Sequence, residues 1–99
     1  MSAAQRIVEK TMSADEPEVL RCLAQLLASL GIAGDAPLDR LPLGNGTVAV
    51  TITRLAPIRL GGLLVLPRSL VTLGFSATSY ALEASFLKSF NSAFQRGGG

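Results

Sequence analysis

Residues 57–75, PIRLGGLLVLPRSLVTLGF, limit the possible folds more than any other part of this sequence, because they are long, apolar and carry only two charges, both arginine. A membrane-spanning helix needs about 20 consecutive apolar residues. Pro57, Gly61-Gly62 and Pro67 interrupt the run, and an arginine near the centre of a bilayer costs roughly 3 kcal/mol or more. We therefore interpret the stretch as β-strands separated by turns, and we expect no membrane span.

The turns follow from the residue types. Gly61-Gly62 fits a two-residue hairpin turn, because the central positions of such turns favour positive backbone φ. A second turn is expected at residues 67–69, Pro-Arg-Ser. Just upstream, residues 47–54 (TVAVTITR) alternate larger and smaller side chains, which is typical of a half-buried strand, and Asn45-Gly46 in front of them is a turn signal. An antiparallel sheet of three or four strands over about residues 47–75 is predicted.

Two amphipathic helices flank this region in sequence. Residues 16–30 begin after Asp15, a good helix cap, and carry an apolar stripe at three- and four-residue spacing: Val19, Cys22, Leu23, Leu26, Leu27 and Leu30. Residues 79–95 place aromatic and leucine side chains at four-residue steps: Leu82, Phe86, Phe90 and Phe94. Strands grouped between helices predict an α+β fold, a two-layer sandwich with the helices on one face of the sheet.

The rest of the domain organisation is simple. Residues 1–12 hold too few apolar positions to form a stable helix alone, so a weakly ordered segment or a short helix is expected there. Residues 13–96 are predicted to form one α+β domain, and 97–99 a glycine tail.

The composition points to self-association. Hydrophobic residues make up 48% of the chain and charged residues 16%, against about 25% charged in an average protein. A small core cannot hold all of this apolar material, and a large exposed patch on a soluble monomer is unfavourable. The second sheet face has no assigned cover. We therefore expect a homodimer, with the interface candidates Ala49, Thr51, Thr53, Leu64 and Leu66.

Charge is unevenly distributed along the chain. Residues 1–46 carry four basic and six acidic side chains, whereas residues 47–99 carry five basic side chains and Glu83 alone. Guanidinium groups bind carboxylates and phosphates in a bidentate manner, so Arg54, Arg59 and Arg68 are candidates for holding a small anion or an acidic partner protein. The alternative is that they are solubilising charges at the sheet edge. No aromatic residues interleave with them, so nucleic acid is not expected as a partner.

Groups for catalysis are scarce. The chain has no histidine, and its one cysteine, Cys22, lies in an apolar stripe where burial is expected. The acids at 15, 16 and 18 are explained by a helix start, and those at 35 and 39 by turns. No phosphate-binding glycine motif or metal-ligand spacing is present. We therefore predict no catalytic residues, no metal and no cofactor.

These observations predict a small, non-catalytic binding domain of bacterial type that is homodimeric and, lacking an apolar signal-peptide core at its N-terminus, cytoplasmic. The main alternative is an accessory or ligand-binding subunit of an enzyme that uses the arginine cluster to hold an anionic ligand. A stand-alone enzyme and a peripheral membrane protein are further alternatives.

Overall fold

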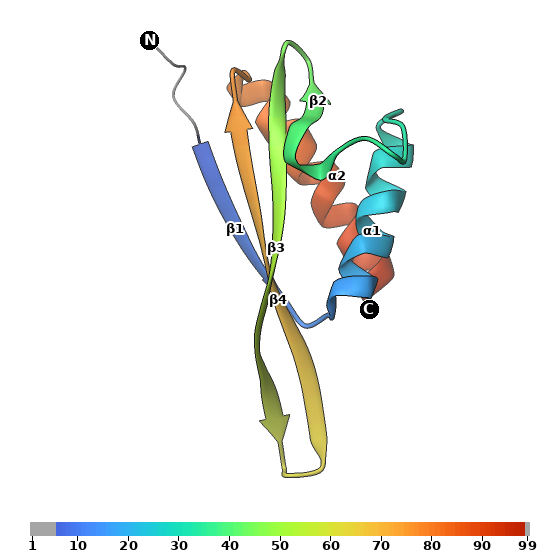
Figure 1. Cartoon of the computed structure of the whole chain (residues 1–99), viewed down its shortest axis with the longest axis vertical. Helices are drawn as coiled ribbons and strands as arrows, with labels where there is room; N and C mark the ends of the chain where they lie inside the picture. Colours follow the sequence, from blue (N-terminus) through green and yellow to red (C-terminus); the bar gives the residue numbers. More distant parts are fainter. Residues whose placement is uncertain (1–5, 99) are drawn as a thin grey trace.

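The computed structural model describes residues 6–98, with side chains through Gln95 (Figure 1). Within these residues the chain forms four strands, two α-helices and one short 3-10 helix. In order they are β1 (Arg6–Met12), α1 (Glu16–Ser29), η1 (Leu38–Arg40), β2 (Leu41–Leu43), β3 (Gly46–Leu60), β4 (Leu64–Ser76) and α2 (Tyr80–Gly98).

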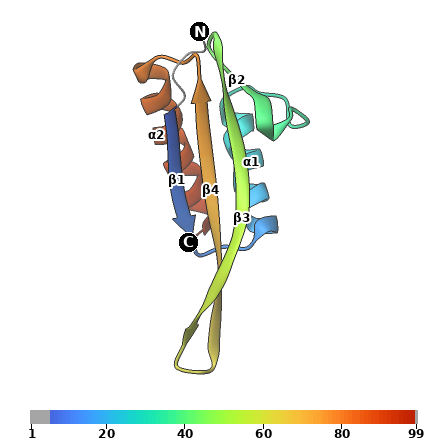
Figure 2. The same cartoon turned by 60° about the vertical axis from the view of Figure 1, so that its left-hand side comes forward.

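The four strands form one antiparallel sheet in the order β1-β4-β3-β2. Both helices lie on the same face of this sheet, side by side, and no helix among residues 6–98 lies on the opposite face (Figures 1 and 2). The α+β two-layer sandwich predicted from the sequence is confirmed.

The core lies between the sheet and the two helices. Strands β3 and β4 contribute alternate side chains, including Val50 and Phe75, and the predicted stripe of α1 packs against them. Phe86 and Phe90 of α2 are 1% and 0% exposed, so the aromatic ridge covers the sheet as expected. Phe75 and Phe86 meet edge to face at 5.7 Å, and Phe90 and Phe94 stack at 4.4 Å. Such geometry adds about 0.5–1.5 kcal/mol per aromatic pair beyond area burial.

The N-terminal segment was predicted wrongly over its described part. Residues 6–12 are not a helix or a weakly ordered segment but strand β1, which pairs with β4 from Arg6↔Phe75 to Met12↔Ser69. Seven residues with few apolar positions form a helix poorly, but every second residue of β1 can exchange ladder hydrogen bonds with the neighbouring strand β4. Residues 1–5 lie outside the described residues.

The predicted turn at Gly61-Gly62 is confirmed, with Leu63 added to it. Leu60 pairs with Leu64, and both glycines adopt positive φ, 64° and 78°. The predicted turn at residues 67–69 is wrong, because β4 runs unbroken through Pro67. The proline lies opposite a bulge in β3 between Leu55 and Ile58, and β1 ends its pairing at Ser69, so no regular ladder bond is lost.

Two further boundaries differ from the prediction. The turn into β3 occupies residues 44–45 and not Asn45-Gly46, because Leu43 pairs with Gly46. Helix α2 continues to Gly98, past the predicted end at residue 95, so residues 97–98 belong to the helix and not to a tail. Gly99 lies outside the described residues.

The long strands β3 and β4 extend beyond the rest of the sheet as a two-stranded ribbon. We call residues 54–68 the arm. It projects past the end of β1 and past both helices (Figures 1 and 2), and it accounts for the elongated shape of the molecule, 50 × 28 × 22 Å. The arm has a sheet partner on neither of its edges among residues 6–98.

Candidate interaction surface

The sheet face opposite the helices, which we call the outer face, is defined by strand alternation and register. On β3 and β4 its cross-strand pairs are Ala49–Gly74, Thr51–Thr72 and Thr53–Leu70. The intervening side chains, such as Val50 and Leu73, point to the core and are 5% and 0% exposed. Strand β1 adds Ile7, Glu9 and Thr11 to the outer face, and Ile7 is 61% exposed.

The outer face continues onto the arm. Leu64 and Leu66 share the alternation of Leu70 on β4, and beyond the bulge they pair with Leu60 and Ile58 of β3. All five interface candidates therefore fall on one face, following the twist of the ribbon: Ala49, Thr51, Thr53, Leu64 and Leu66. No helix or strand among residues 6–98 covers that face (Figure 1).

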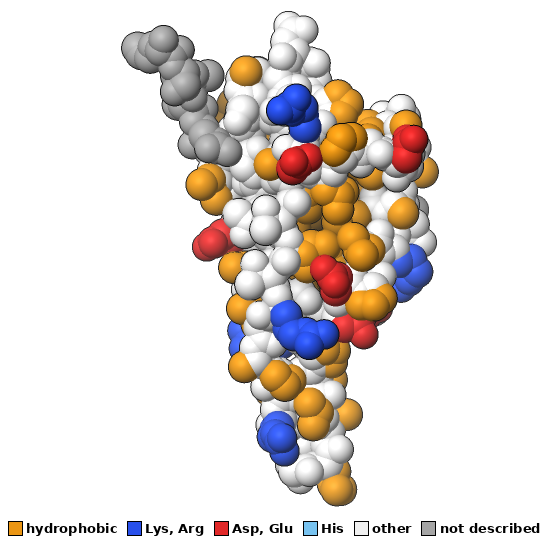
Figure 3. Space-filling view, in the orientation of Figure 1, with side chains coloured by type: hydrophobic (Ala, Val, Ile, Leu, Met, Phe, Trp, Pro, Cys, Tyr) orange, Lys and Arg blue, Asp and Glu red, His pale blue; other side chains and the backbone are white. Residues whose placement is uncertain are grey.

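The end of the arm is the most exposed apolar part of the described chain. The exposed fractions of its large side chains are 38% for Ile58, 48% for Leu60, 98% for Leu63, 52% for Leu64 and 49% for Val65. Hydrophobic side chains continue along the projecting ribbon in Figure 3. Exposed apolar side chains scattered singly are normal, but a contiguous group of this kind marks an interaction site.

The edges of the arm are poorly suited to pairing with another strand. Pro57 and Pro67 each lack a backbone donor, and the bulge between Leu55 and Ile58 breaks the regular spacing on β3. Prolines, bulges and charges are the features by which proteins keep edge strands from pairing. The faces and the tip of the arm are therefore better suited to binding than its edges.

The structure brings two of the three candidate arginines together. Arg54 and Arg68 line a cavity of about 220 Å³ at the base of the arm, together with Asp15, Glu16, Leu55, Pro57, Pro67 and Ser69. Arg59 lies five residues beyond Arg54 on β3, roughly 16 Å along the strand. None of the three makes an ion pair within the described part of the chain. Because two carboxylates line the same cavity, a bound anion would meet repulsion as well as attraction.

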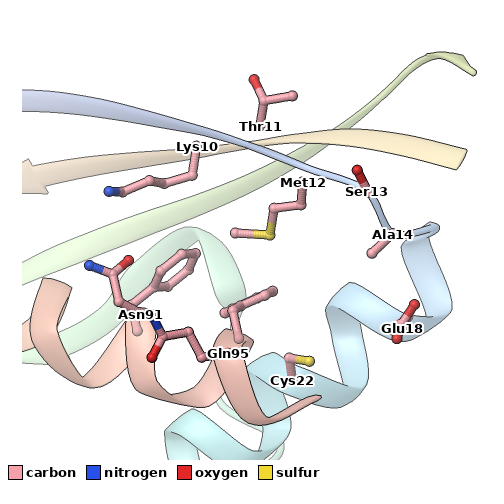
Figure 4. Close-up of a pocket in the computed structure, with 11 residues that line it drawn as sticks. Lys10, Thr11, Met12, Ser13, Ala14, Glu18, Cys22, Asn91 and Gln95 are labelled. Atoms are coloured by element: carbon pink, nitrogen blue, oxygen red, sulfur yellow. The ribbon is translucent and has the colours of Figure 1, made fainter. Parts of the chain in front are cut away.

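A second, larger cleft of about 430 Å³ lies where the end of β1 meets both helices. Figure 4 shows Lys10 and Met12 extending from β1 toward Asn91 and Gln95 of α2, with Cys22 at the side of α1. The remaining lining residues are Thr11, Ser13, Ala14, Glu18, Phe90 and Phe94. Sequence reasoning missed this cleft because strand β1, one of its walls, was not predicted.

The chemistry available in that cleft is limited. Cys22 is 1% exposed, as the sequence predicted, and the chain has no histidine to take its proton. Lys10 and Glu18 are the charged groups of the lining. Within residues 6–98 no three acidic or cysteine side chains gather in a way that could hold a metal ion.

The buried carboxylate of Glu83 has a structural partner on each oxygen. Its Oε2 accepts a hydrogen bond of 2.9 Å from Thr78 Oγ1, and its Oε1 lies 3.5 Å from Arg6 Nε without accepting a hydrogen bond. The Arg6 guanidinium also lies over the ring of Tyr80, 5.5 Å from its centroid. These contacts attach the start of β1 to the start of α2.

No family model, curated protein or solved structure matches this chain. We therefore infer function from the residues of the chain and their arrangement. No helix within residues 6–98 is long and apolar enough to cross a membrane.

Proposed function

We propose that this protein is a small, non-catalytic binding domain that works as a homodimer joined through the outer face. The observation that carries the proposal is the outer face itself. It is a central strip of threonine, alanine, glycine and leucine residues that continues onto an arm with exposed leucines, and no described helix or strand covers it.

A second copy of the chain is the occupant that suits this face best. Stable interfaces bury about 800 Å² on each partner, and two sheets pack well face to face at about 10 Å. The outer face extends along the 50 Å length of the molecule and combines small side chains on the body with large ones on the arm. Because a twofold interface uses the same patch twice, one exposed surface can satisfy both partners.

The non-catalytic part of the proposal rests on the available side chains. The larger cleft holds a buried thiol with no histidine to take its proton, and the cavity at the base of the arm mixes two arginines with two carboxylates that would repel a bound anion. The proposal also includes the cytoplasmic location expected from the sequence, which fractionation of cells that express the protein would test.

The experiment is a matched pair of leucine substitutions. Leu70 lies at the centre of the outer face, opposite Thr53 on one side and Thr11 on the other. Leu20 is a 42% exposed leucine of α1, away from the sheet. Leu70→Glu should convert the dimer to a monomer in analytical ultracentrifugation, because two carboxylates would be buried in one interface. Leu20→Glu should leave the dimer intact. If Leu70→Glu stays folded by circular dichroism and remains dimeric, the outer face is not the interface.

A further inference from the structure

The outer face carries one acid and one base among residues 6–95, and their positions specify how two copies would meet. Glu9 on β1 pairs in register with Thr72 of β4. Arg68 lies four residues away on β4 and shares the alternation of Leu70 and Thr72, and it also borders the cavity at the base of the arm that Asp15 and Glu16 line. The two charges are therefore about 13 Å apart along the strands. Neither makes an ion pair within the described residues.

We propose that two copies pack outer face to outer face about a twofold axis that crosses the strands at the level of Leu70, so that Arg68 of each copy meets the partner's Glu9. This inference rests on the proposed self-association and adds its geometry. A twofold axis perpendicular to the strands reverses the strand direction in the second copy. A residue two positions before Leu70 on β4 therefore faces the residue two positions after Leu70 on β4 of the other copy. Residue 68 thereby comes level with the partner's Thr72, beside which the partner's Glu9 lies.

The same operation matches large side chains with small ones. At the axis, Leu70 of one copy faces Leu70 of the other. Leu66, four residues below, comes level with the partner's Gly74, which pairs with the partner's Ala49. The arm of each copy thus lies over the body of the other, and its exposed leucines cover the outer face where the side chains are smallest. Large side chains opposite small ones allow close packing at an interface.

The other simple arrangement is unfavourable. An axis parallel to the strands keeps their direction, so Arg68 would come level with the partner's Arg68 and both arms would project side by side. Facing like charges across an interface opposes association. The charge pattern therefore favours the twofold axis perpendicular to the strands, in which the two arms point in opposite directions.

The test exchanges the two charges. Glu9→Arg should weaken the dimer about 100-fold or more, because Arg68 would meet an arginine of the partner at two places in each dimer, and Arg68→Glu should do the same with two carboxylates. Mixing the two single variants should restore association to within about tenfold of wild type, because each contact then joins an arginine to a glutamate. Arg59→Glu, which changes a charge on the opposite face of the arm, is the control and should leave the dimer unchanged.

A milder variant guards against misfolding. In Arg68→Lys, a zero-length carbodiimide reagent should join the introduced amine to Glu9 of the partner. The separation of about 13 Å along the strands is too long for that link within one copy. Mass spectrometry of the cross-linked dimer would identify the peptide pair.

The outcomes separate the geometry from the self-association it rests on. Wild-type dimers with single variants that dimerise equally well, or with no link between positions 9 and 68, would overturn the geometry and leave the homodimer standing. Folded single variants that stay monomeric when mixed would also overturn it. Wild type that stays monomeric up to about 100 μM would overturn both, and flotation of that monomer with anionic vesicles would assign the face to lipid.

Discussion

Making the arm polar should abolish association and leave the fold intact. The variant carries four substitutions at exposed apolar positions of the outer face and of the turn at the tip: Ile58→Thr, Leu60→Thr, Leu63→Ser and Leu64→Thr. Threonine retains a high β-propensity, so the ribbon should persist. These side chains are 38–98% exposed and belong to no part of the buried core. Surface substitutions of this kind usually change the free energy of unfolding by about 0.5 kcal/mol or less each.

The expected loss of association is much larger. The four side chains are on average a little over half exposed, and complete burial of one such side chain is worth about 1.5–3 kcal/mol. Covering them contributes about 3.5–7 kcal/mol per copy, and each dimer contains two copies, so even the lower bound predicts a dissociation constant raised by about 10⁵-fold. Sedimentation equilibrium measures the dissociation constant, and urea unfolding at concentrations below it measures the stability of the monomer without the dimer contribution.

Two results would refute this reasoning. An unchanged dissociation constant would show that the arm is not part of the interface. A loss of several kcal/mol in monomer stability would show that the exposed side chains are needed for folding, in which case the arm is a structural element and not a binding one.

Two substitutions test the fold that supports the outer face. Ser69 is 1% exposed and its Oγ donates a 2.6 Å hydrogen bond to the Ala14 carbonyl, so Ser69→Ala should cost about 1–3 kcal/mol and lower Tm by roughly 4–8 °C per kcal/mol. Ser29→Ala, at an exposed position of α1 whose hydroxyl donates a hydrogen bond to the Leu26 carbonyl of the same helix, should change little. An equal Tm for both variants would contradict the importance of the buried hydrogen bond. Gly46→Ala would push a Cβ into the backbone oxygens of Ser76 and Ala77, so thermal unfolding should show a loss of at least about 1 kcal/mol. Gly34→Ala, where a Cβ meets nothing within 4 Å, is the control, and equal stability of the two would mean that β3 and β4 do not approach as described.

The helices and the fold class could be predicted because their signals are local. The apolar stripe of α1 and the aromatic steps of α2 repeat at helical spacing, and Asp15 caps α1 as its position suggested, by accepting a hydrogen bond from the Glu18 amide. The glycine pair at 61–62 requires positive φ wherever it lies, so the hairpin could also be located.

Strand β1 and the arm could not be predicted because their signals depend on partners distant in sequence. Residues 6–12 become a strand through pairing with β4, about 60 residues later. Pro67 looks like a turn residue in isolation, and only the opposing bulge in β3 shows why a strand tolerates it. The relation between Glu9 and Arg68 likewise exists only in the sheet register.

The mass of the wild-type protein in solution tests the central claim most directly. Sedimentation equilibrium over a series of concentrations should show a reversible transition from 10.3 kDa to twice that mass. The dimer should predominate above a dissociation constant in the micromolar range, about −8 kcal/mol of association free energy. A single species of 10.3 kDa that stays soluble at every concentration would show that the outer face and the arm need no second copy, and would contradict the proposed function.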